Sequence, residues 1–162
     1  MVQKDIHTIV LEYESEYELE PVDQKLVHQA KLSTDNAYAP YSNFKVGAAV
    51  LLENGKMIHG NNQENAAYPS GLCAERVALF FANSNFPEIK VRRIAIAAKN
   101  GEDFTKLPIT PCGSCRQVIL ETQNRFELPI KIILYGTDKV QIIEDASTLL
   151  PISFNDQFLK KS

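Results

Sequence analysis

The stretch FKVGAAVLLENGKMIHG, residues 44–60, is the strongest indication of the fold, because it predicts two antiparallel strands. Apolar residues occupy both sides of Asn54-Gly55, and Asn-Gly is the preferred pair for a two-residue hairpin turn whose central residues need positive φ. We therefore expect a β-hairpin here, with the remaining elements arranged around it.

Helices are predicted on either side of the hairpin. Pro21 can open a helix that runs to about Ala37, with an apolar stripe at Val22, Leu26 and Ala30. Residues 73 to about 83 carry apolar side chains at the spacing of a core-facing helix, namely Ala74, Val77, Ala78 and Phe81.

The later part of the chain alternates strands and helices. VRRIAIAAK (91–99) and LPIKIILYG (128–136) are β-rich runs, and a helix lies between them, with Thr110 as its N-cap and Pro111 at its first position. VQIIED (140–145) predicts a last strand, and ASTLLPISF (146–154) predicts a terminal turn or short helix.

The order α-β-β-α-β-α-β-β predicts an α/β fold, a three-layer α-β-α sandwich with a mixed sheet of about five strands. We expect one domain over residues 21–162. Residues 1–20 are an N-terminal extension, in which glutamates alternate from Glu12 to Glu20. This extension is interpreted as an added edge strand or arm, or alternatively as a merely solvated acidic face.

Composition restricts the possible partners. The net charge is -3, and no cluster of lysine and arginine is present to neutralise phosphates, which argues against nucleic acid. The start MVQKDIHTIV has no basic segment followed by an apolar run, and no stretch approaches the roughly 18 apolar residues of a membrane helix. We expect a cytoplasmic protein without membrane contact.

The three cysteines all lie in CAER (73–76) and PCGSCR (111–116). A Cys-x-x-Cys in a cytoplasmic protein indicates metal or redox chemistry. Cys112 and Cys115, three apart on a helix, share one face, and Cys73 adds a third thiolate. Three ligands with an open fourth position are typical of catalytic zinc, whereas structural zinc usually has four protein ligands.

The residues beside the cysteines fit this interpretation. Both helix N-termini favour thiolate over thiol, and Arg76 and Arg116 are expected to donate hydrogen bonds to sulfur. Glu75 lies in a first helical turn, from which it can reach metal-bound water as a base. The histidines, His7, His28 and His59, are remote from both motifs.

These motifs together resemble the zinc-dependent cytidine deaminases of the small homotetrameric nucleoside type. The resemblance runs from about Ala37 to Phe154 and rests on AYAPYSNFKVGAAV (37–50), GNNQENAAYPSGLCAERVALF (60–80) and TPCGSCRQVI (110–119). Nucleotide and polynucleotide deaminases usually carry His-x-Glu where this chain has Cys73-Ala74-Glu75. The resemblance implies a cytidine deaminase-like fold and a cytoplasmic hydrolase of pyrimidine salvage. Its reaction would convert cytidine and deoxycytidine to uridine and deoxyuridine with release of ammonia.

The resemblance also implies roles for single residues. One Zn²⁺ per subunit would be held by Cys73, Cys112 and Cys115, with Glu75 as the proton shuttle between water, N3 of cytosine and the leaving amine. Substrate would be bound by Phe44 beside the base, Asn62 and Glu64 at the ribose hydroxyls, Ala74, and Phe154 from a neighbouring subunit of a homotetramer.

Other functions remain open at this point. A structural zinc module that binds a protein partner would also hold the metal, and a thiol oxidoreductase would use Cys112 and Cys115 alone. Neither explains Glu75 beside Cys73, nor the sequence NQEN (62–65). Within the family, a blasticidin-type deaminase shares the zinc motifs, and a nucleic-acid editor is disfavoured by the acidic balance.

Overall fold

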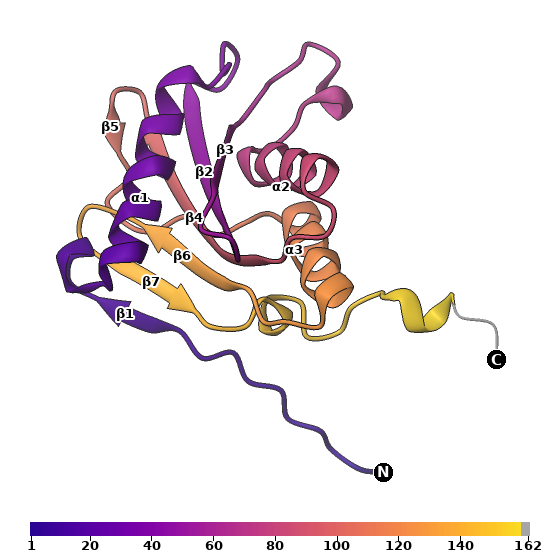
Figure 1. Cartoon of the computed structure of the whole chain (residues 1–162). Helices are drawn as coiled ribbons and strands as arrows, with labels where there is room; N and C mark the ends of the chain where they lie inside the picture. Colours follow the sequence, from indigo (N-terminus) through magenta and orange to yellow (C-terminus); the bar gives the residue numbers. More distant parts are fainter. Residues whose placement is uncertain (160–162) are drawn as a thin grey trace.

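The computed structural model describes residues 1–159, so the last three residues of the predicted domain 21–162 lie outside the described residues. Its strands are β1 (Leu11–Tyr13), β2 (Phe44–Leu52), β3 (Met57–Asn61), β4 (Val91–Asn100), β5 (Asp103–Phe104), β6 (Lys131–Tyr135) and β7 (Val140–Ile143). They form one seven-stranded sheet in the order β1-β7-β6-β4-β2-β3, with β5 paired to β4 (Figure 1).

The sheet is mixed, as predicted. β4 and β6 are parallel, and the other pairs that the structure describes are antiparallel. The five strands predicted for the domain are all present, and the edge strand β1 and the short β5 bring the total to seven, against the about five expected. β1 extends one edge, and β5 spans only two residues, too short for a period of alternation to reveal it in the sequence.

Helices cover both faces of the sheet, which confirms the three-layer α/β architecture. α1 (Pro21–Ser33) lies on one face, and α2 (Ala74–Asn85) and α3 (Gly113–Phe126) lie on the other (Figure 1). A hydrophobic core lies on each face of the sheet, and alternate residues of β4 pack into one or the other. Ile94 and Ile96 pack toward α2 and α3, and Ala95 and Ala97 pack toward α1. No helix in the described part of the chain is both long and apolar enough to cross a membrane.

The predicted hairpin is present, but the prediction of a two-residue turn is wrong. Gly55 has φ +84 and its N–H donates to the carbonyl of Leu52 over 2.9 Å, while the Leu52 N–H donates to the carbonyl of Lys56 over 2.9 Å. The left-handed conformation is therefore confined to Gly55, at the end of a three-residue loop. A type I turn followed by one left-handed residue matches the strand twist, so Asn54 needs no positive φ.

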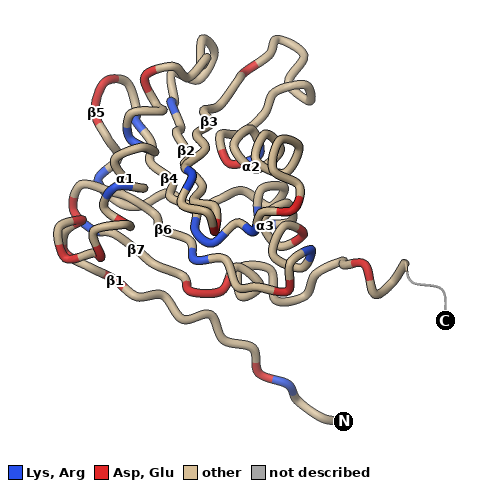
Figure 2. Tube along the Cα trace, viewed as in Figure 1, with Lys and Arg blue, Asp and Glu red and all other residues tan. Residues whose placement is uncertain are grey.

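The N-terminal extension is attached to the domain by pairing and by charge. β1 runs antiparallel to β7, and the hydroxyl of Thr8 donates to the carbonyl of Thr148 over 2.6 Å. Of the alternating glutamates, three form ion pairs: Glu12 with Lys139, Glu16 with Lys31 and Glu20 with Arg93. Acidic residues gather where the extension meets α1 (Figure 2). The edge-strand interpretation is thus the correct one for residues 11–13, and the acidic face is only partly solvated.

Candidate active site

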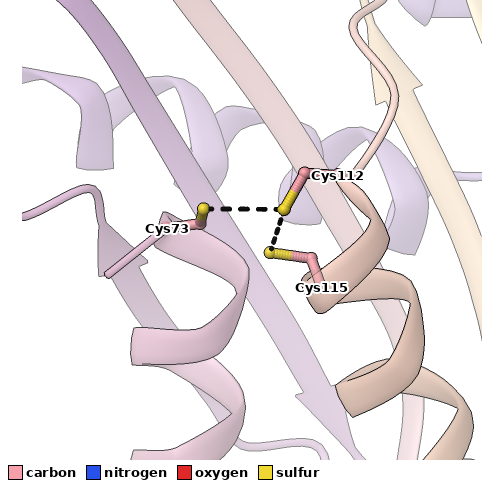
Figure 3. A group of neighbouring side chains, drawn as sticks. All are labelled: Cys73, Cys112 and Cys115. Atoms are coloured by element: carbon pink, nitrogen blue, oxygen red, sulfur yellow. Dashed lines mark hydrogen bonds between the residues drawn. The ribbon is translucent and has the colours of Figure 1, made fainter. Parts of the chain in front are cut away.

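The N-termini of α2 and α3 lie side by side, and together they carry all three cysteines (Figure 3). Cys73 is the N-cap of α2, Cys112 is the N-cap of α3, and Cys115 lies in the first turn of α3. Thr110 is therefore not the N-cap of this helix, and Pro111 lies outside it. Arg116 explains the later start, because its Nε donates to the Pro111 carbonyl over 2.9 Å and so holds that segment against the helix end.

The three sulfur atoms point toward one another (Figure 3). Cys112 Sγ lies 3.8 Å from Cys73 Sγ and 3.5 Å from Cys115 Sγ, and the three sulfurs all lie within 4.8 Å of one another. All three thiols are free. Zinc–sulfur bonds of about 2.3 Å at tetrahedral angles place two sulfurs about 3.8 Å apart. The cluster therefore fits a zinc ion, and three protein ligands leave its fourth position open.

The cluster concentrates negative charge on Cys73. Hydrogen bonding to the Cys115 thiol, together with the Arg76 guanidinium and the Cys112 thiol, outweighs burial and lowers the pKa of Cys73 to about 5. The same hydrogen bond and burial raise the pKa of Cys115. A thiolate is the form of cysteine that binds metal, so Cys73 is prepared for this role at neutral pH.

Glu75 lies in the first turn of α2 and is only 3% exposed. Burial raises the pKa of its carboxyl, and the nearby negative charge of Cys73 adds to the effect. A glutamate that merely complements a helix dipole would be expected at the surface, whereas this one is enclosed beside Cys73 and Cys115. It is positioned for proton transfer next to the metal ligands.

The two arginines differ in what they contact. Arg76 Nη2 lies 3.9 Å from Cys73 Sγ and 3.5 Å from the Gly71 carbonyl oxygen, as expected for a donor to sulfur. Arg116 instead donates to oxygens: the carbonyls of Pro111 and Leu149 and the hydroxyl of Thr110. The expectation that Arg116 donates to sulfur is therefore wrong, because neighbouring loops occupy its guanidinium.

A cavity of about 530 Å³ adjoins Cys73, a size typical of small-molecule sites. Asn62 and Glu64 line it, as do Cys73 and Arg76. The other lining residues were not predicted from the sequence; they are Tyr41, Ser42, Gln63, Asn65, Tyr68, Gly71 and Leu72. The turn-forming runs Pro40-Tyr41-Ser42-Asn43 and Tyr68-Pro69-Ser70-Gly71 are the signals that could have indicated loops beside the site.

The remaining predicted substrate residues lie outside this lining. Phe44 is the half-buried first residue of β2, and Ala74 is fully buried at the start of α2. Phe154 is 58% exposed in the C-terminal segment, where its ring stacks on that of Phe158 with centroids 5.7 Å apart. The structure therefore does not bring Phe154 into the cavity of its own chain.

Backbone groups from β2 and the preceding loop fix the polar wall of the cavity. The side-chain oxygen of Asn62 accepts from the Val46 N–H over 2.7 Å, and its nitrogen donates to the Phe44 carbonyl over 2.9 Å. Glu64 accepts from Tyr41 and Ser42. These hydrogen bonds, the Ser42 hydroxyl foremost, hold the pKa of Glu64 below its ordinary value, so this wall carries a negative charge.

Known proteins are similar to this chain in sequence and in structure. Residues 20–127 match the family described as the cytidine and deoxycytidylate deaminase zinc-binding region. A cytidine deaminase of Sporosarcina psychrophila is 40% identical over 138 residues, which cover 84% of this chain and 93% of that protein. A cytidine deaminase of Halalkalibacterium halodurans is 47% identical over 98 residues, which cover 60% of this chain and 70% of that protein.

The fold agrees with the sequence match. The crystal structure of a cytidine deaminase from Burkholderia pseudomallei aligns with a TM-score of 0.69 and 40% identity, covering 80% of this chain and 97% of that one. The family match spans the hairpin, both cysteine motifs and the cavity wall. The chain therefore belongs to the family of cytidine and deoxycytidylate deaminases that share this zinc-binding region.

Proposed function

We propose that this protein is a zinc-dependent hydrolase that removes the 4-amino group of cytidine and deoxycytidine. The observation that carries the proposal is the convergence of three free thiols beside the buried Glu75 carboxyl, at one wall of a cavity of about 530 Å³. The relatives named cytidine deaminase support it, since they match most of the chain.

Cys73, Cys112 and Cys115 would hold the zinc ion. When bound, zinc supplies a nucleophile at neutral pH by lowering the pKa of a coordinated water to about 7. Arg76, whose Nη2 lies 3.9 Å from Cys73 Sγ, withdraws part of the charge that three thiolates would place on the ion. This makes the site more electrophilic than three thiolates alone would allow.

Glu75 moves the protons. Its carboxylate accepts one proton of the attacking water and delivers it to N3 of the base. It then takes the remaining proton from the new hydroxyl on C4 and gives it to the amine, so that the C4–N bond breaks, ammonia departs and uridine remains. Its burial keeps bulk water from competing for these protons. A positioned acid–base group of this kind typically contributes about 10² to 10⁴ in rate.

Asn62 and Glu64 bind the sugar. An ionised carboxylate only accepts hydrogen bonds, so Glu64 is suited to a neutral hydroxyl donor. In the described part of the chain, Arg76 is the one lysine or arginine that lines the cavity, and it is engaged with Cys73. A 5′-phosphate would meet the charge of Glu64 without a free cation, which favours the nucleoside over its monophosphate.

We extend the proposal to a homotetramer in which Phe154 completes the site of a neighbouring copy. Its support is that Phe154 is exposed and remote from its own cavity. Phe80 and Phe81 on α2 are also 48% and 53% exposed, which leaves apolar surface for a partner copy.

The loss of ultraviolet absorbance of cytidine on addition of purified protein tests the proposal, with a Glu75→Ala variant and a zinc assay in parallel. We expect turnover by the wild type alone, with zinc in both proteins. Turnover of blasticidin S in preference to cytidine would assign the other branch, and deamination of single-stranded oligonucleotides would assign an editor. Stoichiometric zinc without any turnover would support a structural zinc module.

A further inference from the structure

We propose that Ser42 is a positioning residue that orients the Glu64 carboxylate toward the sugar of the substrate. The inference rests on the proposed function, since it assigns to Glu64 a substrate hydroxyl as partner. Ser42 and Glu64 are 22 residues apart in the sequence, and both line the cavity.

The two oxygens of Glu64 are held in different ways. Oε2 accepts from two backbone groups, the N–H of Tyr41 over 2.9 Å and the N–H of Ser42 over 3.3 Å. Oε1 accepts a short hydrogen bond from the Ser42 hydroxyl, its one hydrogen-bond partner among the described residues. The backbone contacts therefore fix the position of Oε2. The Ser42 hydroxyl alone prevents the carboxylate from rotating about Oε2 and so fixes the position of Oε1.

The direction of the Ser42 hydroxyl is itself fixed. Its oxygen accepts from the N–H of Phe44 over 3.0 Å, and a hydroxyl has a single proton to donate. Asn43 between them has φ +53, a left-handed conformation that asparagine tolerates better than most residues. This turn brings the Phe44 N–H back to the Ser42 oxygen, so the hydroxyl proton is left for Glu64.

The network leaves room for one substrate group. A carboxylate offers about four acceptor positions, of which the Tyr41 and Ser42 donors occupy three. The fourth belongs to Oε1, the oxygen that Ser42 holds. A hydroxyl that meets an already oriented acceptor pays less ordering entropy on binding, so Ser42 contributes to affinity without touching the substrate.

The test is a comparison of two substrates in three variants. We expect Ser42→Ala to raise KM for cytidine about tenfold, which corresponds to about 1.4 kcal/mol, with kcat and zinc content within twofold of wild type. Ser42→Thr keeps the hydroxyl and should restore KM. Ser84→Ala, an exposed serine whose hydroxyl bonds to the Phe81 carbonyl, serves as the matched control.

The second substrate, 2′,3′-dideoxycytidine, lacks the 2′- and 3′-hydroxyls of the sugar, one of which is the proposed partner of Glu64, and keeps the 5′-hydroxyl. With it, Ser42→Ala and wild type should have equal kcat/KM, because the group that Ser42 orients has no partner to bind. An equal loss on both substrates would show that Ser42 only stabilises the loop and would overturn the inference, as would an unchanged KM for cytidine. Absence of cytidine turnover by the wild type would instead contradict the proposed function, and the inference with it.

Discussion

Gly60 and Ala74 touch through their backbones: a Cβ atom at Gly60 would lie only 2.7 Å from the carbonyl oxygen of Ala74. Ala74 is the first residue of α2 and directly follows Cys73. The absence of a side chain on β3 thus lets the helix that carries one cysteine approach the sheet, and this approach sets where that cysteine lies relative to Cys112 and Cys115.

Gly60→Ala is therefore expected to weaken zinc binding as well as the fold. The added methyl would push α2 away from β3, with a cost of about 1 to 3 kcal/mol typical of overpacking. Thermal melts and zinc retention against a chelator measure the two effects. Gly113→Ala is the matched control, since nothing lies within 4 Å of a Cβ there, at the start of the other cysteine-bearing helix. Equal zinc retention in both variants would contradict the role of this contact.

Glu75→Gln should keep zinc and lose most turnover. The amide preserves the shape of the buried side chain but cannot accept and return a proton, so kcat should fall by about 10² to 10⁴. Zinc content by atomic absorption and cytidine turnover on the same sample check this. A variant that retains wild-type kcat would exclude Glu75 as the proton shuttle.

Cys112→Ala should release the metal. Its sulfur lies between the other two, 3.8 Å from Cys73 and 3.5 Å from Cys115, so two remaining thiols would bind zinc far more weakly. The same variant should melt at a lower temperature in the presence of zinc, because the metal stabilises the folded state by mass action. Ser114→Ala, an exposed neighbour on the same helix, should leave both properties intact, and full zinc in Cys112→Ala would remove that residue from the ligand set.

Mixed assemblies should reveal whether Phe154 acts across subunits. Phe154→Ala and Glu75→Gln are each expected to be nearly inactive alone. Co-expression would produce assemblies in which an intact Glu75 site receives an intact Phe154 from a neighbour, so activity should reappear. Sedimentation gives the oligomeric state of each sample, and a monomer with full activity would contradict the shared site.

Stability should depend on pH through Asp145. Burial raises the pKa of this carboxyl, but hydrogen bonds from Gln123 and Ser147 outweigh that effect, so the pKa of Asp145 is lowered overall. Its contribution is therefore fully present above the unfolded pKa of about 3.9 and is lost as pH falls through the lower folded value. Urea unfolding of wild type and Asp145→Asn should give a difference in free energy that narrows below about pH 4. Because metal loss at low pH affects both proteins, a constant difference would contradict the assignment.

The sequence predicts most of the fold because its signals are local. The helix of residues 73–83 follows from the spacing of apolar side chains, and the hairpin follows from Asn54-Gly55 between two apolar runs. The exact turn depends on how a twisted pair of strands closes, which the dipeptide alone does not determine. β5 has two residues and makes no periodic signal.

The candidate site, like the fold, was predictable only where its signals are local in the sequence. Cysteines at fixed spacing on helices indicate a metal cluster, and the structure brings Cys73, Cys112 and Cys115 together. The contacts of Ser42 and Arg116 could not be predicted from the sequence. Ser42 donates to Glu64, 22 residues away, and Arg116 donates to the nearby Pro111 and Thr110 but also to Leu149, 33 residues away. The two long-range hydrogen bonds, to Glu64 and to Leu149, leave no pattern in neighbouring residues.

β1 also has a protective consequence. It occupies the outer edge of β7, whose residues VQII would otherwise present unpaired backbone groups beside an apolar surface. Such a bare edge is a template for strand addition by other molecules, and a charged, three-residue strand such as β1 is a poor one. Removal of the extension should therefore cause aggregation before it affects chemistry, which light scattering of a chain lacking residues 1–20 would detect.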